Sequence, residues 1–360
     1  MLRLRLTQKI GIKSTTSEFM NSSRDQTSPN RITLHELADV TGVSIATVSR
    51  ALRDLPAVHK ETRASIRDAA QKLGYIPDQG GVRLRTGKTQ SVGIVVHQED
   101  PLYVFGYSLI QGMHEQLRNS GYTLIILSDE KGGRRSLDEC LKSRMVDGLI
   151  LTHTMKRDPR IRSVIEAGIP LVTYGRSDIS GPYDWHDFDN ETFAYQAVQT
   201  LAEAGCDKII MPLPSRAYNF NEYMKKGYLR ALREQGLKSY ETNLKVDVDT
   251  NEFYSKAKDI LAKKDSPNGW VCVRDHNILP LLSAVESQGK VIGSELQIAA
   301  KQANENLNFL NVPMVRFRQD LRQAGSRIIK SLLNRIRTPS SNSEGVLLDL
   351  PRIHLKKEAI

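Results

Sequence analysis

The first residues whose pattern suggests a binding function are Arg50 and its neighbours. A helix over residues 44–52 would carry on its outer side Ile45, Ala46, Ser49 and Arg50. Ser44 is a good N-cap for such a helix. The pattern indicates a helix that could reach base edges in duplex DNA.

The preceding residues supply an element that could hold this helix. Residues 33–40 have a helical period, and a three-residue turn separates them from the next helix. Ala38 would lie where the two helices cross, and Gly42 in the turn can adopt a positive φ at little cost. The inward face would consist of Leu34, Leu37, Val43, Val48 and Leu52. With a third helix over residues 61–73, this predicts a helix-turn-helix domain over residues 31–75.

Basic charge is concentrated in the same part of the chain. Residues 1–90 hold 15 Lys and Arg against 8 Asp and Glu, whereas all 360 residues together carry a net charge of +10. The other residues therefore add only +3. A basic segment beside a nearly neutral body indicates a head that binds a polyanion. A small helical hairpin without a ligand is the alternative.

Two segments around this domain lack a helical or strand period. Residues 1–30 are mostly polar, and we expect a disordered leader. Residues 76–90 contain a proline, three glycines and three basic residues, which is typical of a hinge or linker.

From residue 91 onwards, short apolar runs alternate with amphipathic stretches. We expect strands at 92–96, 123–127, 148–152, 171–174, 208–211, 245–248, 269–273 and 297–299. We expect helices at 107–120, 136–144, 190–204, 221–235, 252–263 and 278–288. Such alternation predicts an α/β body with parallel sheets covered by helices. Its length exceeds one ordinary doubly wound domain, so we expect two lobes within residues 91–356.

Composition and missing motifs exclude several classes of protein. Hydrophobic residues make up 39% and charged residues 26%, as in soluble globular proteins. No apolar run is long enough to cross a membrane, so we expect a cytoplasmic protein. The three cysteines are far apart and predict neither a disulfide nor a metal site. No common catalytic or nucleotide-binding motif occurs, and we expect no enzyme activity, cofactor or metal.

The run YDWHDFDN at residues 183–190 is the densest group of polar side chains. A metal or acid–base site is one interpretation of this run. Ligand binding or loop capping is the interpretation we favour.

An ordered series of motifs resembles one known family. The head carries VSIATVSRAL, Val58, Thr62-Arg63, LGYIP and RTGKT. The body carries Gly93-Ile94-Val95-Val96, Gly121-Tyr122, Val146-Asp147-Gly148-Leu149-Ile150, Gly168-Ile169-Pro170, Asp189-Asn190, Gln319-Asp320 and Ala324-Gly325. Over about residues 31–356 the chain resembles the LacI/GalR (lactose and galactose repressor) family of bacterial transcription regulators.

The resemblance implies roles for six residues of the second helix and its cap. Ile45, Ala46 and Arg50 would stand at base-reading positions, and the Arg50 guanidinium can donate two parallel hydrogen bonds to guanine O6 and N7. Ser44, Thr47 and Ser49 would mainly contact phosphates. The family hinge folds into a short helix on the operator, and Leu84 matches the leucine that enters the minor groove. The expected DNA contacts also include Tyr75 and Arg83.

The hinge departs from the family pattern at two places. Asp78 replaces a common asparagine, and Gly80-Gly81 replaces small residues that favour helix. A glycine inside a helix costs about 1 kcal/mol. We therefore expect a hinge that folds less readily on DNA.

The resemblance also implies a two-lobed body like that of periplasmic sugar-binding proteins. Lobe 1 would hold about residues 91–188 and 313–339, and lobe 2 about 189–312 and 340–356. The effector, a small molecule in the cleft between the lobes, would contact Phe105, Arg176, Asp189, Asp275 and Lys301. Met224 and Lys301-Gln302 depart from the family pattern. We expect a sugar or sugar derivative, with a charged metabolite as the second choice.

These inferences combine into one functional hypothesis. We expect a homodimeric regulator, and a repressor in particular, that binds a DNA operator under the control of a small-molecule effector. A ligand-binding protein or sugar-modifying enzyme with an incidental basic head is the alternative. Sequence-independent DNA compaction is a third possibility.

Overall fold

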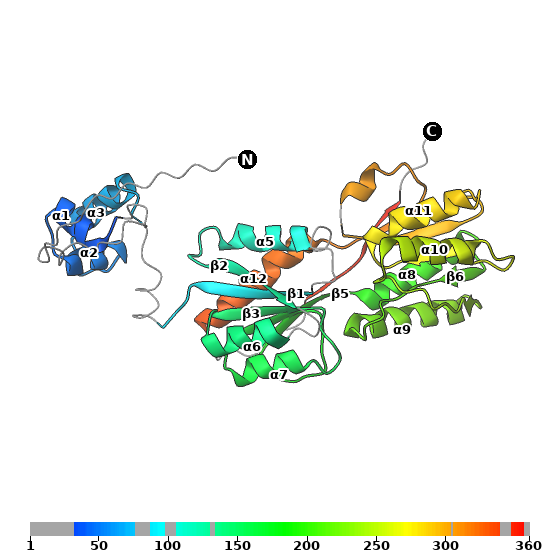
Figure 1. Cartoon of the computed structure of the whole chain (residues 1–360), viewed down its shortest axis with the longest axis horizontal. Coiled ribbons are helices and arrows are strands. Elements are labelled where there is room, and N and C mark those ends of the chain that lie inside the picture. Colours follow the sequence, from blue (N-terminus) through cyan, green and yellow to red (C-terminus); the bar gives the residue numbers. More distant parts are fainter. Residues whose placement is uncertain are drawn as a thin grey trace, which may run out of the picture. The chain divides into compact units, whose positions relative to one another are not determined.

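The protein divides into two units, Met1–Gly81 and Val82–Ile360. The computed structural model describes residues 32–75, 87–97, 106–129, 134–303, 305–338 and 347–355. The leader expected at residues 1–30 lies outside the described residues, as do residues 76–86 of the expected hinge. Figure 1 shows helices alone in the first unit and helices around strands in the second.

The described residues of the first unit form three helices, as the sequence predicted. They are α1 (Leu34–Thr41), α2 (Ile45–Leu52) and α3 (Lys60–Lys72). At the start of α1, the Thr33 hydroxyl accepts a hydrogen bond from the Glu36 N–H, and the Glu36 carboxylate accepts one from the Thr33 N–H. This capping box satisfies two backbone donors that the helix leaves unpaired. Gly42 ends α1 with φ +67° and directs the chain into α2.

The predicted inward face forms the core of this unit. Leu37 and Val48 are fully buried against Ile66 of α3, and Ala38 is buried beside them. Leu34, Val43 and Leu52 pack at the edge of the same cluster. After α2 the chain turns at Asp54, which has φ +59° although it is not glycine. Its carboxylate pairs with Arg63 and Arg67 of α3, at 2.6 and 3.0 Å, and so ties the turn to that helix.

The second unit contains two six-stranded sheets. The first has the order β11-β5-β4-β3-β1-β2 and its strands pair in parallel. Its strands are β1 (Ser91–His97), β2 (Thr123–Asp129), β3 (Gly148–Thr152), β4 (Leu171–Tyr174), β5 (Asp184–Phe188) and β11 (Leu347–Asp349). The second has the order β12-β10-β9-β8-β6-β7. Its strands are β6 (Lys208–Ile210), β7 (Lys238–Ser239), β8 (Gly269–Cys272), β9 (Gln297–Gln302), β10 (Val315–Arg318) and β12 (Arg352–Leu355).

Helices cover both faces of each sheet, so this unit is the α/β body with parallel sheets that the sequence predicted. The first sheet carries α5 (Tyr107–Leu117), α6 (Arg134–Ser143), α7 (Pro159–Glu166) and α12 (Leu321–Arg337). One of its faces packs on α5 and α12, and the other packs on α6 and α7. The second sheet carries α8 (Asn190–Glu203), α9 (Asn219–Glu234), α10 (Thr250–Leu261) and α11 (Ile278–Ser287). In the second sheet β12 alone runs antiparallel to its neighbour.

The two lobes are divided differently from our expectation. The chain crosses from β5 to α8, then from β10 to α12, and finally from β11 to β12. We had placed the second crossing near residue 312 and the third near 340, and both were too early. Phe317 of β10 is buried in the core of the second lobe, and β11 pairs with β5 of the first. The assignments of residues 313–318 to lobe 1 and of 347–349 to lobe 2 were therefore wrong.

One strand prediction is wrong, and the polar run at residues 183–190 forms a strand that the sequence did not predict. Residues 245–248 form no strand, because only an isolated bridge joins Lys245 to Leu213, while β7 occupies the sheet edge beside β6. The polar run at residues 183–190 is largely strand β5. Its polar side chains have partners on α12 and β11: Asp184 pairs with Arg335 at 2.6 Å, and His186 lies 2.7 Å from Asp349.

No helix within the described residues has the length and apolar character that a membrane crossing requires.

Glycines let pairs of helices approach closely. A Cβ on Gly112 of α5 would lie 1.9 Å from the carbonyl oxygen of Arg322, and a Cβ on Gly325 of α12 would lie 2.0 Å from that of Leu109. In the second lobe, a Cβ on Gly227 of α9 would lie 2.1 Å from the carbonyl oxygen of Glu191. These contacts explain why small residues stand at those positions.

Gly112→Ala should therefore force α5 away from α12. Overpacking of this kind costs about 1–3 kcal/mol in unfolding free energy, although alanine favours the helix itself. Urea unfolding of the full chain measures the loss, and Gln116→Ala on the exposed side of α5 is the matched control. Equal midpoints for the two variants would contradict the close packing of α5 and α12.

Candidate DNA-binding helix and interlobe cleft

Helix α2 presents the predicted DNA-contacting side chains on its surface. Ser44 caps the helix, accepting a hydrogen bond from the Thr47 N–H at 3.2 Å. The side chain of Ile45 is 38% exposed although it is apolar, and Ala46 and Arg50 are exposed beside it. Thr47 and Ser49 are half-buried. The structure thus brings together all six residues that the sequence singled out on this helix.

Arg50 and Arg53 have different surroundings on the same helix. The Nε of Arg53 donates to the carbonyl oxygen of Ser49 at 3.1 Å. The guanidinium of Arg50 makes no hydrogen bond or ion pair within the part of the chain that the structure describes. All the donors of Arg50 therefore remain available to a ligand, whereas Arg53, the C-cap residue of α2, uses one of its donors on the helix.

The other predicted DNA contacts lie further along the chain. Tyr75 is half-buried and packs at the edge of the first unit's core. Arg83 and Leu84 lie outside the described residues, as do Asp78 and Gly80-Gly81.

A cleft opens in the second unit where strands of both sheets end. Its first side is lined by His153 after β3, Tyr174 at the end of β4 and Asp187 in β5. Its other side is lined by Asp275 after β8 and Lys301 in β9. The cleft encloses about 800 Å³ of unfilled space, part of it open to solvent. Carboxyl ends of parallel strands are the usual place for a ligand in such folds.

Lys301 is the most unusual charged group in the cleft. Its ammonium donates to the Asn190 Oδ1 at 3.3 Å and lies 5.4 to 5.8 Å from the ring centres of Phe188, Phe193 and Phe220. Burial, assisted by the positive charge of Arg274, lowers the pKa of Lys301 to about 8. The group can therefore lose its charge at only slightly alkaline pH.

Asp187 joins the cleft to a contact between the lobes. Its Oδ2 accepts from the Nε of Arg176 at 2.8 Å, and its Oδ1 accepts from the Phe188 N–H. Burial raises the pKa of Asp187, while the charge of Arg176 opposes that rise. The Arg176 guanidinium also lies over the ring of Tyr223 in α9, 3.5 Å from its centre. Arg176 thus links the two lobes beside the cleft and is not among the residues that line it.

Only some of the remaining predicted effector contacts lie in the cleft. Asp275 and Lys301 both line the cleft. Asp189 instead caps α8, accepting from the N–H and the hydroxyl of Thr192, and it is Asp187 that places a carboxylate in the cleft. Phe105 lies outside the described residues.

The cleft is also lined by Asp187 and Asn190, which belong to the run at residues 183–190 for which the sequence favoured ligand binding or loop capping. Sequence reasoning missed the other lining residues, which are His153, Tyr174, Gly175, Pro214, Phe220, Val273, Arg274, His276, Ala303 and Gln319. His153, Tyr174 and Arg274 stand at or just after strand ends, and this position is the signal that could have identified them. Met224, the departure noted in the sequence, is fully buried in the second lobe's core.

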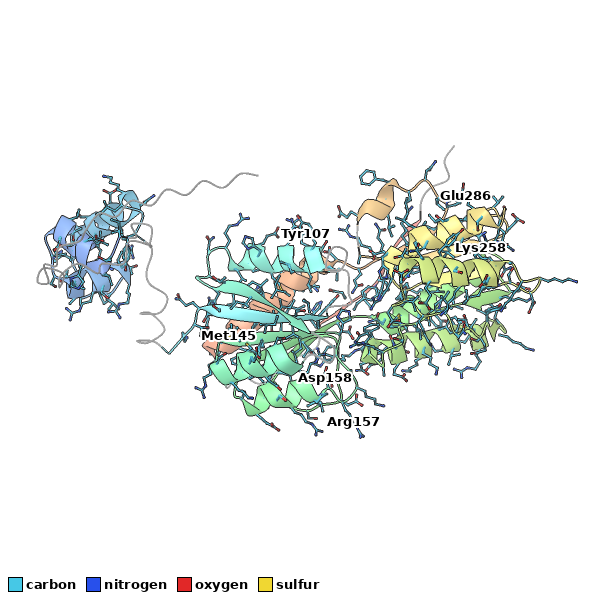
Figure 2. The ribbon with its side chains drawn as sticks, viewed as in Figure 1. Tyr107, Met145, Arg157, Asp158, Lys258 and Glu286 are labelled. Atoms are coloured by element: carbon cyan, nitrogen blue, oxygen red, sulfur yellow. The ribbon has the colours of Figure 1, made fainter. Side chains whose placement is uncertain are left out.

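A short loop after β3 holds one side of the cleft. His153 has φ +52°, and Arg160 donates to the carbonyl oxygens of Thr152 and His153 at 3.1 Å. Arg160 in turn pairs with Asp158, which caps α7 and is labelled in Figure 2. This buried pair keeps the loop in its left-handed turn.

The same loop touches the second lobe. The Asn219 N–H donates to the carbonyl oxygen of Thr154 at 2.9 Å, and the Asn219 amide donates to that of Arg176 at 2.8 Å. The His153 ring lies 5.2 Å from that of Tyr218. A ligand bound against His153 would therefore meet the point where the lobes join.

Comparisons with known proteins agree with this geometry. Residues 33–78 match the model of the bacterial regulatory proteins of the lacI family, and residues 89–351 match that of the periplasmic binding proteins and sugar-binding domain of the LacI family. The transcriptional regulator AglR of Rhizobium meliloti is 30% identical over 85% of this chain and 88% of its own length. The regulator RafR of Escherichia coli is 29% identical over 73% of this chain and 79% of its own.

Solved structures share the fold. A lac repressor dimer bound to operator and the anti-inducer ONPF superposes with a TM-score of 0.76 and 19% identity, over 91% of this chain and 98% of that one. The regulator CelR in complex with cellobiose gives a TM-score of 0.64 at 22% identity, over 91% and 99%. With a helix-turn-helix unit, a two-lobed α/β body and family models that match most of its length, the chain belongs to the LacI family of bacterial transcriptional regulators.

Proposed function

We propose that this regulator represses transcription from an operator that two copies bind together, and that a sugar in the interlobe cleft controls its affinity for that operator. The observation that carries the proposal is the combination of an exposed, unpaired Arg50 on α2 with a cleft at the carboxyl ends of two parallel sheets. The first feature suits base recognition, and the second suits a small ligand.

The composition of the cleft supports a sugar as the effector. Tyr174 and Phe220 offer aromatic faces for the C–H side of a sugar ring, while Asp187 and Asp275 offer acceptors for hydroxyl groups. The CelR structure, whose ligand is cellobiose, has the same fold. A charged metabolite is the second choice, because Lys301 and Arg274 also line the cleft.

The groups in the cleft favour binding over catalysis. Asp187 is engaged by Arg176, and the Asp275 carboxylate accepts from the Ala303 N–H at 3.3 Å. These bonds hold the carboxylates in place as acceptors. We therefore propose a regulator without enzyme activity, which works in the cytoplasm, where the bacterial chromosome lies.

Exposed apolar side chains support a homodimer. Tyr107 on α5 is 67% exposed (Figure 2), and Phe309 in the short helix Glu305–Phe309 is 87% exposed. One helix-turn-helix unit reads too few base pairs for useful specificity, so two copies would bind half-sites about 10 base pairs apart.

Selection of genomic DNA fragments by the full chain tests the proposed function. We expect enrichment of a two-fold symmetric site, and loss of enrichment when residues 1–81 are removed. Equal affinity for all duplexes would indicate sequence-independent compaction. Binding of sugars without any selection of DNA would favour the alternative of a ligand-binding protein.

Arg50→Ala should weaken specific operator binding by about 1–3 kcal/mol, because it removes a bidentate contact to guanine. Affinity for random DNA should change little. Arg53→Ala is the matched control, since it removes an equal charge from the C-cap residue of α2, whose side chain donates to the carbonyl oxygen of Ser49. Gel shifts on operator and random duplexes measure both affinities. An equal loss on both duplexes would make Arg50 a phosphate contact.

Effector binding should depend on pH through Lys301. The ammonium can donate to a sugar oxygen only while it is protonated, so binding raises its pKa above about 8. Affinity should therefore be constant below pH 7 and should fall as pH rises through 8 and 9. Calorimetric titration of the full chain with the sugar that gives the largest thermal shift measures this. Lys301→Met should bind weakly at every pH; a variant with the wild-type pH profile would exclude Lys301 as the cause.

A further inference from the structure

We propose that the carboxylate of Asp147 fixes the direction in which the chain enters the body, and that specific operator binding depends on this contact. The inference rests on the proposed function, because it concerns how the body presents the DNA-binding units to an operator. Asp147 would act as a positioning residue that touches neither DNA nor effector.

The carboxylate of Asp147 accepts hydrogen bonds from the backbone N–H groups of two consecutive residues, Thr89 and Gln90. Its Oδ1 accepts from the N–H of Thr89 at 2.7 Å and from the Thr89 hydroxyl at 3.0 Å. Its Oδ2 accepts from the N–H of Gln90 at 3.0 Å. Hydrogen bonds to an ionised carboxylate are about twice as strong as neutral ones. Both oxygens thus hold the two residues that precede β1.

The bound segment adopts a backbone conformation that needs such support. Gln90 has φ +50°, which is unfavourable for a residue with a side chain. The Thr89 hydroxyl also accepts from the N–H of Ser91, and the Gln90 carbonyl oxygen accepts from the N–H of Thr123. The chain is therefore turned at a set angle immediately before it enters the sheet.

The contact lies at the end of the first lobe opposite to the cleft. The Asp147 N–H donates to the carbonyl oxygen of Ser91 at 2.8 Å, where β1 and β3 both begin. The five residues of β3 are all buried, and His153 follows them into the cleft. Residues on either side of one short, rigid strand thus contact the entry segment and the effector site.

Asp147 contributes little to the apolar packing of this lobe. It is half-buried, and its carboxylate oxygens are occupied by polar partners in the entry segment. Its further partner is Tyr122, whose pKa is raised by burial and then by the charge and hydrogen bond of Asp147. The carboxylate is therefore needed for the entry turn more than for the lobe's core.

Asp147→Asn tests the proposal, because it keeps the size of the side chain but replaces one acceptor oxygen by an NH2 group. Asp138→Asn, which removes an exposed carboxylate from α6, is the matched control. We expect Asp147→Asn to weaken operator binding about 2- to 30-fold, the range over which such coupling mutations act. Affinity for random DNA should stay at the control's value, and the variant should remain fully folded at the temperature of the binding assay, although its melting temperature falls because the three bonds are weakened. Hydrogen exchange at the Thr89 and Gln90 amides should become faster.

A second pair of variants keeps the test independent of charge. Thr89→Ala removes one of the three bonds to Asp147, together with the bond from the Ser91 N–H to the hydroxyl, and should give an intermediate loss. Thr89→Ser keeps the hydroxyl and should bind operator like the wild type. Operator binding by Asp147→Asn at the wild-type level would overturn the proposal. A fall in melting temperature that accounts for the whole loss of operator binding would overturn it as well. Failure of the wild type to select any DNA site would instead contradict the proposed function.

Discussion

The cleft depends on one constraint, the parallel order of the strands in both lobes. Because parallel strands end at the same edge of a sheet, the residues that follow β3, β4 and β5 gather on one side, and those that follow β8 and β9 gather on the other. Three crossings between the lobes then turn the two edges toward one another. The side chains that could bind a ligand come from distant parts of the sequence, and only this arrangement places them together.

Polar contacts between the lobes, more than apolar ones, are the contacts through which a bound ligand can change how the two lobes are arranged. The lobes join beside the cleft through the Asn219 hydrogen bonds to Thr154 and Arg176. At the crossing after β11, Asp349 holds His186 and Arg327, and its carbonyl oxygen accepts from the Asp189 N–H. A ligand shifts the equilibrium between two arrangements of the lobes only if it binds one arrangement more tightly than the other. Such a ligand can act on these contacts.

The sequence predicted the elements whose signals are local. The helices of the first unit have caps and an apolar period within a few residues, and strands such as β3 are continuous apolar runs. Strand β5 has no such signal, because its polar side chains are satisfied by partners up to 163 residues away. The crossings were misplaced for the same reason: Phe317 belongs to the second lobe through contacts that no local pattern reveals. Asp275 and Lys301 could be found because they lie at or just after strand ends, but recognising Asp187 rather than Asp189 as the carboxylate in the cleft required the helix cap to be seen.

The central claim is that the cleft and the DNA-binding unit are coupled, and thermodynamic reciprocity tests it most directly. The first measurement is the affinity of the full chain, with and without operator, for the sugar that raises its melting temperature most. The second is its affinity for operator with and without that sugar. Coupling requires that both affinities change by the same factor, typically about 5- to 150-fold. Sugar binding that is equally tight in the presence and absence of operator would contradict the account.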